Sequence, residues 1–300
     1  MTPKRFPSVI LATCPVPWTE AHTFDEALFR LVVRRWRTEL TPYLYIFGTA
    51  GEGYAVTDTQ FESITRAFLA EMPAGTYPMV GVISLSLGTV IERIQVGRKL
   101  GARLFQISLP SWGALTDSEV DVFFRETCGR FPDCQFLHYN LARTKRLLTG
   151  DDYARLTAAH PNLVAIKMGG EDTAAFADIL QKAPTIQCFF TDFGYAALRD
   201  THECGFLMAL AAVHLEQAKR YFAARGAELA GMRDELRAIH HSLKAAVGTE
   251  AHMDGAYDKL FVKLREPRFP LRLLPPYAST SDATFARFRD SLPAAWRGSL

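Results

Sequence analysis

The chain has 300 residues, and 48% of them are hydrophobic, so it can build a large core and is not expected to be disordered. Lys and Arg number 34 against 32 Asp and Glu, and the longest like-charged cluster is Arg34-Arg35 with Arg37 close by. This near balance gives no reason to expect nucleic acid or an anionic membrane as a partner.

The cysteine pattern is typical of a reducing compartment. The number is odd, no Cys-x-x-Cys pair occurs, and four of the five lie beside or inside apolar runs, so we expect buried free thiols. They are Cys14, Cys128, Cys134, Cys188 and Cys204. The segment from Met1 to Arg5 leads into an apolar run too short for a secretion signal, and no apolar run is long enough for a membrane span. The sequence predicts a soluble, cytoplasmic protein.

Short apolar runs rich in Val, Ile, Leu, Phe and Tyr recur along the chain and predict strands. Such runs, without alternation of polar residues, suit a parallel sheet that is covered on both faces. In chain order they are Ser8–Thr13, Tyr43–Gly48, Tyr77–Ile83, Arg103–Ser108, Gln135–Tyr139, Leu163–Met168, Ile186–Thr191 and Gly205–Leu210.

Segments with helical periodicity separate these runs. Apolar stripes lie within Phe24–Trp36, Phe61–Phe68 and Val120–Cys128. Cap-type residues precede three helices, at Thr57-Asp58, Thr116-Asp117 and Asp151-Asp152. An eightfold strand–helix repeat favours an α/β fold of the closed (β/α)8 (TIM) barrel type. A doubly wound open sheet is the alternative, but Thr13-Cys14-Pro15-Val16-Pro17 follows the first strand without a G-x-G-x-x-G fingerprint.

The pattern changes near Leu215 to helices without intervening strands, through Glu235–Val247 and Tyr257–Leu264. A Pro-rich turn from Arg272 to Pro276 then precedes a last helical stretch from Asp282. We therefore expect a catalytic barrel over residues 1–224 and a small helical appendage over 225–300.

Lys167 is the first candidate catalytic residue, because active sites of such barrels lie at the carboxyl ends of the strands. It closes the buried run Leu163–Ile166, where its amine cannot easily reach bulk water. An apolar environment lowers the pKa of a lysine and frees the amine to attack a carbonyl. The alternative is a structural lysine paired with Glu171 or Asp172.

Two further groups follow strand ends. The turn Gly48-Thr49-Ala50-Gly51-Glu52 offers backbone N–H groups that can bind a carboxylate, or it is simply a tight turn. Tyr139 is either a proton carrier or a core aromatic residue. Neither group is specific by itself.

Together, Gly48-Thr49-x-Gly51-Glu52, Tyr139-Asn140 and Ile166-Lys167 resemble the dihydrodipicolinate synthase / N-acetylneuraminate lyase family. The early Pro, His160-Pro161-Asn162-Leu163-Val164 and the C-terminal helices extend the resemblance to the whole chain. It implies that Lys167 forms the Schiff base, Tyr139 shuttles the proton, Thr49 relays protons, and the backbone of Thr49 and Ala50 holds the carboxylate. The substrate-binding residues are expected to be Ala50, Gly48, Arg143, Trp112 and Leu207, with no metal and no cofactor.

Several positions depart from the family pattern. Ala50 stands where a second hydroxyl is common, and Leu109-Pro110-Ser111-Trp112 replaces the Pro-Pro-Tyr-Tyr of the synthases. The loop Asn140–Thr144 is one residue shorter than in the synthases, so Arg143 either clamps a distal carboxylate or is a solvated loop charge. These departures argue against dihydrodipicolinate synthase itself, and sialic acid lyase is no better supported.

The sequence thus predicts a Schiff-base lyase (an aldolase, synthase or dehydratase) acting on pyruvate or another small 2-keto acid. A catalytically silent, keto-acid-binding regulatory relative is the alternative, although binding alone requires no nucleophile. A metal-dependent aldolase would need clustered His and carboxylates at strand ends, and His138 has no such companions. The second substrate, the direction of reaction and any allosteric regulation are not specified by the sequence.

Two expectations concern the surroundings of the site. The resemblance implies a homotetramer built as a dimer of dimers, with Trp112 near the tighter subunit interface. In addition, Leu85, Leu87 and Trp112 suggest an outer pocket that is too apolar for a sugar or an amino-dicarboxylate.

Overall fold

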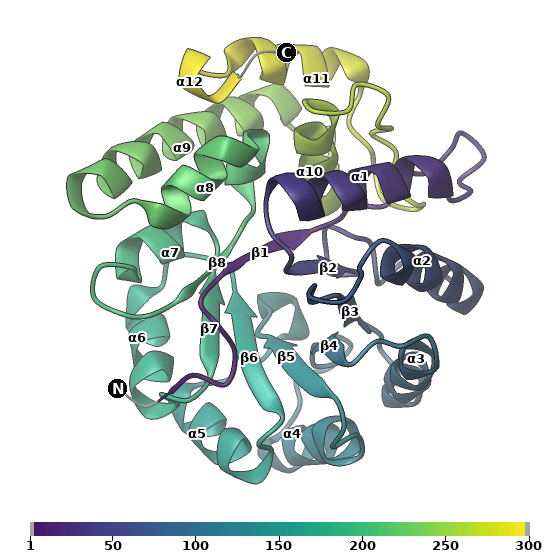
Figure 1. Cartoon of the computed structure of the whole chain (residues 1–300), viewed down its shortest axis with the longest axis vertical. Coiled ribbons are helices and arrows are strands. Elements are labelled where there is room, and N and C mark those ends of the chain that lie inside the picture. The colour runs from purple at the N-terminus through teal and green to yellow at the C-terminus, as the bar shows by residue number, and fades with distance from the viewer. Residues whose placement is uncertain (1–2, 298–300) are drawn as a thin grey trace.

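The computed structural model describes residues 3–297 and contains a closed barrel of eight parallel strands in the order β1 to β8, with β8 returning to β1 (Figure 1). Each predicted run contains one strand, so the predicted (β/α)8 fold is confirmed. The strands are β1 (Ile10–Thr13), β2 (Leu44–Ile46), β3 (Met79–Gly81), β4 (Leu104–Ile107), β5 (Gln135–Tyr139), β6 (Leu163–Met168), β7 (Gln187–Phe190) and β8 (Gly205–Leu207).

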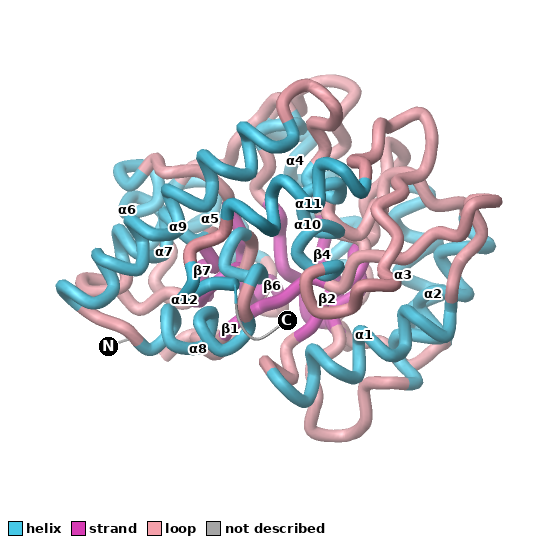
Figure 2. The backbone as a smooth tube through the Cα atoms, turned by 90° about the horizontal axis from the view of Figure 1, so that it is seen from above, coloured by secondary structure: helices cyan, strands magenta, loops and turns pink. Residues whose placement is uncertain are grey.

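Helices surround the strands, as the view in Figure 2 shows. Those of the barrel are α1 (Glu26–Glu39), α2 (Asp58–Ala70), α3 (Leu87–Lys99), α4 (Asp117–Phe124), α5 (Gly150–Ala159), α6 (Thr173–Lys182), α7 (Asp192–Leu198) and α8 (Leu215–Ala223). Those of the C-terminal part are α9 (Gly226–Val247), α10 (Asp254–Lys263), α11 (Asp282–Ser291) and α12 (Ala294–Arg297).

The predicted caps are largely those of the structure. Thr57 and Thr116 form capping boxes with the residues three positions later, as the sequence indicated. The fifth helix differs, because its N-cap is Thr149 and Asp152 is the third helical residue that completes the capping box. Sequence reasoning missed Thr149 because Asp151 and Asp152 are themselves good cap residues.

The strands are buried on both faces. Inward-facing side chains such as Leu11, Met79 and Leu137 fill the barrel, and Phe6 packs among them. Outward-facing side chains form a separate, larger core with the helices. In β6, Ile166 belongs to that outer core, so the alternation of a strand directs its neighbour Lys167 into the barrel.

The C-terminal helices lie together at one side of the barrel, at the top of Figure 1 in green to yellow. Helix α9 packs against α7 and α11, and α10 packs against the 3-10 helix Leu210–Val213 that follows β8. This packing brings α9 and α10 to the carboxyl ends of the strands, where both line the main cavity.

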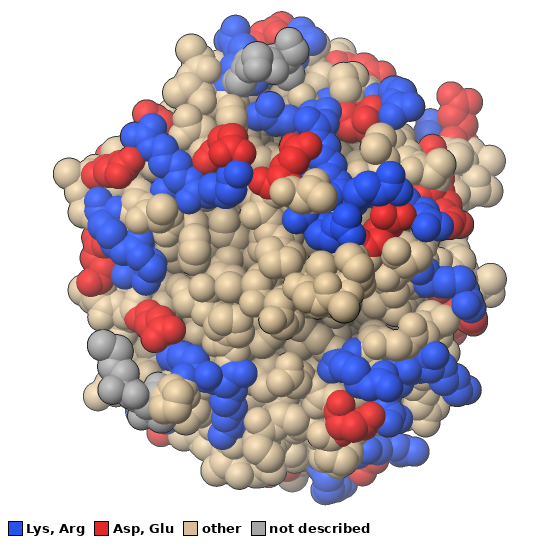
Figure 3. Space-filling model, viewed as in Figure 1, with Lys and Arg blue, Asp and Glu red and all other residues tan. Residues whose placement is uncertain are grey.

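All five cysteines lie within the described residues, where they are buried and form no disulfide, as predicted. On the face shown in Figure 3, basic and acidic side chains intermingle around a largely uncharged middle. None of the helices among residues 3–297 is both long and apolar enough to cross a bilayer.

Candidate active site

Lys167 and Tyr139 lie side by side at the carboxyl ends of β6 and β5. The strand register pairs these two residues directly, and the Asn140 N–H donates to the Lys167 carbonyl at 3.0 Å. The Lys167 Nζ lies 4.3 Å from the centre of the Tyr139 ring and 3.8 Å from that of Tyr45. The sequence-predicted nucleophile and proton carrier are therefore neighbours.

The Lys167 amine is buried without a polar partner. Lys167 is 1% exposed, and its Nζ makes no hydrogen bond or ion pair with any part of the chain described by the structure. Burial lowers the pKa of Lys167 well below its ordinary value, and the negative charges of Asp254 and Asp258 oppose this shift without cancelling it. The lowered pKa increases the fraction of neutral, nucleophilic amine.

The alternative that Lys167 is a structural lysine paired with Glu171 or Asp172 is wrong. Glu171 pairs instead with Arg237 of α9 at 2.6 Å. The Asp172 side chain caps α6 by accepting from the N–H of Ala175 at 3.0 Å. Both carboxylates are thus engaged elsewhere.

The glycine turn after β2 packs closely around Lys167. A Cβ added to Gly48 would lie 2.7 Å from the Tyr45 ring and 3.2 Å from the Lys167 Nζ, so only glycine fits. Thr49 and Ala50 are buried and line the cavity. Their backbone N–H groups have no hydrogen-bond acceptor within residues 3–297, so the turn holds two N–H donors without a partner.

Tyr139 remains protonated at neutral pH. Burial raises the pKa of its phenol to about 12, with a contribution from the negative charge of Asp254, while an interaction with the Thr49 hydroxyl opposes the rise. When the neutral amine attacks a carbonyl carbon, the neutral phenol beside it can supply a proton to the oxygen that leaves that carbon.

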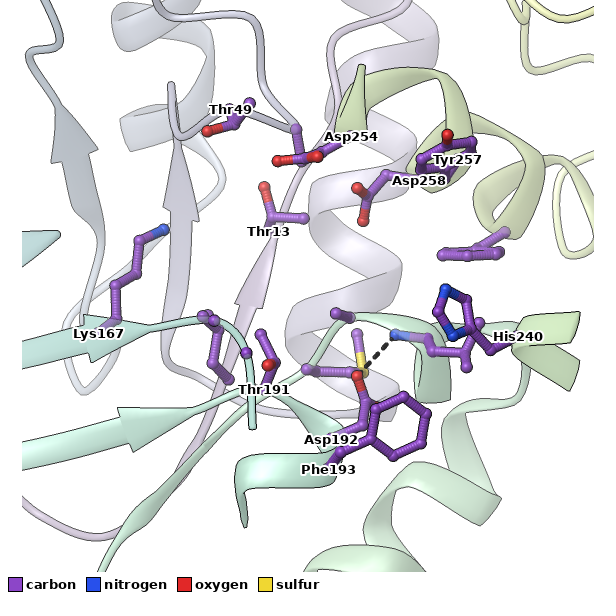
Figure 4. Close-up of a pocket in the computed structure, with 18 of the residues that line it drawn as sticks. Thr13, Thr49, Lys167, Thr191, Asp192, Phe193, His240, Asp254, Tyr257 and Asp258 are labelled. Carbon is purple, nitrogen blue, oxygen red and sulfur yellow. Dashed lines mark hydrogen bonds between the residues drawn. The ribbon is translucent and has the colours of Figure 1, made fainter. Parts of the chain in front are cut away.

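A cavity of about 350 Å³ opens above Lys167 and Tyr139. Its volume lies within the range of small-molecule sites. Leu207 of β8 lines it, together with residues from the ends of β1, β2 and β7. Figure 4 shows Lys167 on one side of the cavity and the α10 residues Asp254 and Asp258 on the other.

The α9 and α10 residues of this cavity were missed by sequence reasoning. They are His240, Leu243 and Lys244 from α9, and Asp254, Tyr257, Asp258 and Phe261 from α10. The spacing of the α10 residues puts them on one helix face, and that was the available signal. Nothing in the local sequence shows that this face of α10 turns toward the barrel.

Arg143 lies in the 3-10 helix Ala142–Thr144 after β5, outside the Lys167 cavity. Its guanidinium donates two hydrogen bonds to the Asp254 carboxylate, at 3.2 and 3.3 Å. It lines an adjoining cavity of about 380 Å³ that shares Thr49. Because Arg143 is already paired with Asp254, it is neither a free charge in the loop nor an unpaired residue that could bind a distal carboxylate.

The structure does not bring Trp112 into the Lys167 cavity. Its side chain is 83% exposed and lines a separate surface groove with Leu85, Leu87 and Val122. Leu85 also lines the adjoining cavity that shares Thr49, so the expectation that Leu85, Leu87 and Trp112 make the outer pocket apolar stays a prediction. Leu87 begins α3 and Trp112 lies in the loop after β4, whereas α10 supplies the wall of the Lys167 cavity.

Comparison with known proteins agrees with this architecture. The model of the Dihydrodipicolinate synthetase family matches residues 6–245. A curated 4-hydroxy-tetrahydrodipicolinate synthase of Exiguobacterium sibiricum is 22% identical over 169 residues, which are 56% of this chain and 57% of that protein. A second such synthase, from another Exiguobacterium strain, is 25% identical over 148 residues, 48% of this chain and 50% of that protein. The chain thus matches about half the length of these relatives.

Solved structures show the same fold. YagE of E. coli K12, solved in complex with pyruvate, has a TM-score of 0.83 at 15% identity and covers 95% of this chain and 97% of its own. Dihydrodipicolinate synthase of Cyanidioschyzon merolae has a TM-score of 0.83 at 18% identity over 99% and 100% of the two chains. N-acetylneuraminate lyase of Proteus mirabilis has a TM-score of 0.80 at 15% identity over 95% and 98%. Since the family model covers most of the chain, the protein belongs to the dihydrodipicolinate synthetase family.

Proposed function

We propose that the protein is a lyase of the lysine Schiff-base type that acts on pyruvate or another small 2-keto acid. The observation that carries the proposal is the Lys167 amine, which is buried, unpaired within the described chain and depressed in pKa. Pyruvate is the ligand in the YagE complex, which supports a 2-keto acid as the partner of this fold.

The reaction begins with attack of the neutral Lys167 amine on the keto carbon. The carbonyl oxygen takes one proton from the attacking nitrogen and one from Tyr139 and leaves as water, so that a C=N bond replaces the C=O bond, the nitrogen carries a positive charge and Tyr139 is left as the phenolate. The N–H groups of Thr49 and Ala50 are the donors for the substrate carboxylate, and the Thr49 hydroxyl lies next to Tyr139 for return of the proton.

The iminium then accepts the electron pair of a bond one carbon away. Cleavage of the bond between the α and β carbons, with transfer of the β-hydroxyl proton to the Tyr139 phenolate, gives an enamine and an aldehyde. For dehydration, transfer of an α proton to the phenolate gives the enamine, from which the protonated β-hydroxyl leaves as water. Addition of the enamine to an aldehyde runs the first reaction in reverse. All three outcomes use the same Lys167 and Tyr139, so the site supports the class rather than one member.

Borohydride trapping tests the proposal. Pyruvate with borohydride should add one reduced adduct to the intact protein, and peptide mapping should locate it at Lys167. Lys167→Ala should abolish the adduct. Lys182→Ala should not, because the Lys182 ammonium is held by Asp151 and Asp178 on the surface.

The same experiment separates the alternative. Absence of an adduct with every 2-keto acid tried, despite binding seen by calorimetry, would favour a silent keto-acid-binding relative. An adduct on Lys259, the other buried lysine near the glycine turn, would overturn the site assignment.

A further inference from the structure

Gln106 is a polar side chain inside the apolar interior of the barrel. It lies in β4 between Phe105 and Ile107, which belong to the outer core, so the alternation of the strand directs its amide inward. Its partners in the strand register are Gly81 of β3 and Leu137 of β5, whose side chains offer no hydrogen bond. Gln106 is 0% exposed and lines neither the main cavity nor the adjoining one, so it lies beneath the site.

Both ends of the Gln106 amide are without a partner. Neither Oε1 nor Nε2 makes a hydrogen bond with any atom of residues 3–297. A buried amide that has lost its water and found no partner is unfavourable in the ligand-free protein. Gln187 of β7 is also 0% exposed, but its amide, in the orientation that satisfies both ends, donates to the Phe6 carbonyl at 3.2 Å and accepts from the Gly205 N–H at 2.8 Å. A glutamine inside the barrel can therefore be satisfied, and Gln106 is not.

The Gln106 amide and the Lys167 amine share the space beside Gly48. A Cβ placed on Gly48 would lie 3.5 Å from the Gln106 Oε1 and 3.2 Å from the Lys167 Nζ. In the strand register Gln106 pairs with Leu137 and Lys167 pairs with Tyr139, so the amide lies one layer of side chains below the amine. The absence of a side chain at Gly48 leaves both polar groups facing the same gap.

The proposed reaction places a positive charge on the Lys167 nitrogen. In the free protein burial favours the neutral amine. The iminium that follows carries a positive charge and one N–H at the same atom. The ring centres of Tyr45 and Tyr139 lie 3.8 and 4.3 Å from this nitrogen and attract a cation, but a ring face accepts an N–H only weakly. An amide oxygen binds a charged donor more strongly than a neutral one, so the iminium is the state in which Gln106 acquires a partner.

We propose that Gln106 is the hydrogen-bond acceptor of the Lys167 iminium and stabilises this intermediate relative to the free amine and the keto acid. When the iminium forms, the Gln106 side chain turns so that its Oε1 accepts the N–H, and no covalent bond changes at the amide. The inference rests on the proposed function and adds a residue to the same site. Interactions that strengthen as charge develops also lower the barrier to forming the charged state. Tyr139 transfers protons, and Gln106 stabilises the charge that remains on the nitrogen.

A short pulse of borohydride on the full chain tests the inference. The protein is equilibrated with pyruvate at a pH just above the midpoint of wild-type trapping, the pulse reduces the iminium already present, and intact mass gives the fraction of adduct. The pyruvate concentration that gives half of the maximal adduct measures the stability of the iminium. Gln106→Met replaces the amide by an unbranched apolar side chain of similar length. We expect this half-maximal concentration to rise about tenfold or more, because a hydrogen bond to a charged group is lost.

The pH dependence of trapping separates this role from a structural one. An acceptor for the iminium N–H also favours the ammonium form of the free amine, so Gln106→Met should move the trapping midpoint to lower pH. The variant then has more neutral amine and yet less iminium, and a simple displacement of Lys167 does not produce both changes. Gln106→Glu keeps an acceptor and adds a negative charge, so it should return the half-maximal pyruvate concentration close to the wild-type value and move the midpoint to higher pH. The other titratable groups that face Lys167 are the same in both variants; they are Tyr45, Tyr139, Asp254 and Asp258.

Gln187→Met is the matched control, because it makes the same change to a buried glutamine whose amide bonds to Phe6 at the amino ends of the strands. It should lower the melting temperature, since it leaves the Phe6 carbonyl and the Gly205 N–H without their partner, but its half-maximal pyruvate concentration should equal that of the wild type. Gln106→Met removes no hydrogen bond made within residues 3–297, so its melting temperature should be at or above that of the wild type.

The outcomes keep the two proposals apart. An adduct at Lys167 with the same half-maximal pyruvate concentration in the wild type and in Gln106→Met would overturn this inference and leave the proposed function intact. A tenfold rise without a lower midpoint would do the same, since Lys167 would only have been displaced. If Gln106→Met fails to fold, the crystal structure of the reduced wild-type adduct decides. A distance of about 3.2 Å or less between the Gln106 Oε1 and the Lys167 Nζ supports the inference, and the absence of this hydrogen bond overturns it. No pyruvate adduct in the wild type would end both proposals.

Discussion

Glu52 and Lys259 form an ion pair whose two side chains are both 0% exposed, with 2.6 Å between Oε1 and Nζ. Glu52 also accepts from the Trp18 indole at 2.8 Å and from the Leu274 N–H at 2.7 Å. Lys259 donates in addition to the carbonyl of Arg272. The pair therefore joins the glycine turn after β2 to α10, the helix that carries Asp254 and Asp258.

Breaking this pair should destabilise the protein strongly. Lys259→Met leaves the Glu52 charge buried without its cation, and we expect a loss of about 3–5 kcal/mol in the free energy of unfolding. Glu52→Gln combined with Lys259→Met should cost less than the sum of the single changes, since no charge remains unpaired. Urea denaturation measures both. Lys219→Met, which removes an exposed pair with Glu216, should change the value by less than about 1 kcal/mol.

Trapping by pyruvate and borohydride should rise with pH. Only the neutral amine attacks, and the pKa of Lys167 lies well below the ordinary 10.5, so the midpoint should lie well below 10.5. Asp254→Asn removes a charge that raises the pKa of Lys167, and should move the midpoint to lower pH. The initial rate of adduct formation by intact mass gives the curve. A midpoint at or above that of free lysine would contradict the buried-amine mechanism.

Tyr139→Phe should separate proton transfer from binding. The ring next to Lys167 remains, but the phenolic proton is lost, so we expect turnover to fall by about 10²–10⁴-fold and adduct formation to slow. Tyr54→Phe is a suitable control, because its hydroxyl is buried without a partner in the adjoining cavity. Steady-state kinetics measures the turnover of both variants. An equal loss of turnover in Tyr139→Phe and Tyr54→Phe would contradict a role of Tyr139 in proton transfer.

Gly48→Ala should impair the site more than the fold. The new Cβ would lie too close to Tyr45 and Lys167, and a displacement of about 1 Å in a reacting group can cost about 10²-fold in rate. Trapping rate and thermal unfolding together report the two effects. Gly231→Ala, in α9 with nothing near the added Cβ, should instead stabilise the protein by about 0.5–1 kcal/mol. A wild-type rate of trapping in Gly48→Ala would show that the turn can shift to make room for the added methyl group.

The groove around Trp112 is expected to lie in a subunit interface of a homotetramer. Trp112, Leu85 and Val122 are large, exposed apolar side chains, and such a patch is a typical interface anchor. Trp112→Arg should shift the mass measured by light scattering toward a smaller species at micromolar concentration. Leu31→Arg, at an apolar and partly exposed position on α1 outside this groove, should leave the mass unchanged. A wild-type protein that is monomeric at that concentration would remove the idea.

Some features of this protein follow from local sequence alone. The eight strands and their helices are visible as short apolar runs and amphipathic segments, because each element must bury its own apolar face. Lys167 and Tyr139 could be placed at strand ends for the same reason, since a barrel collects the carboxyl ends of its strands at one mouth. The glycine turn could be placed there too, as it directly follows β2.

Tertiary structure alone decided the rest. The partner of Glu52 lies 207 positions away at Lys259, the partner of Arg143 is Asp254 on a different helix, and Trp112 turns away from the cavity. No periodicity encodes such contacts, because they depend on how the C-terminal helices dock onto the barrel. The polar wall opposite Lys167, with Asp254 and Asp258, exists only after that docking, which is why the sequence did not predict it.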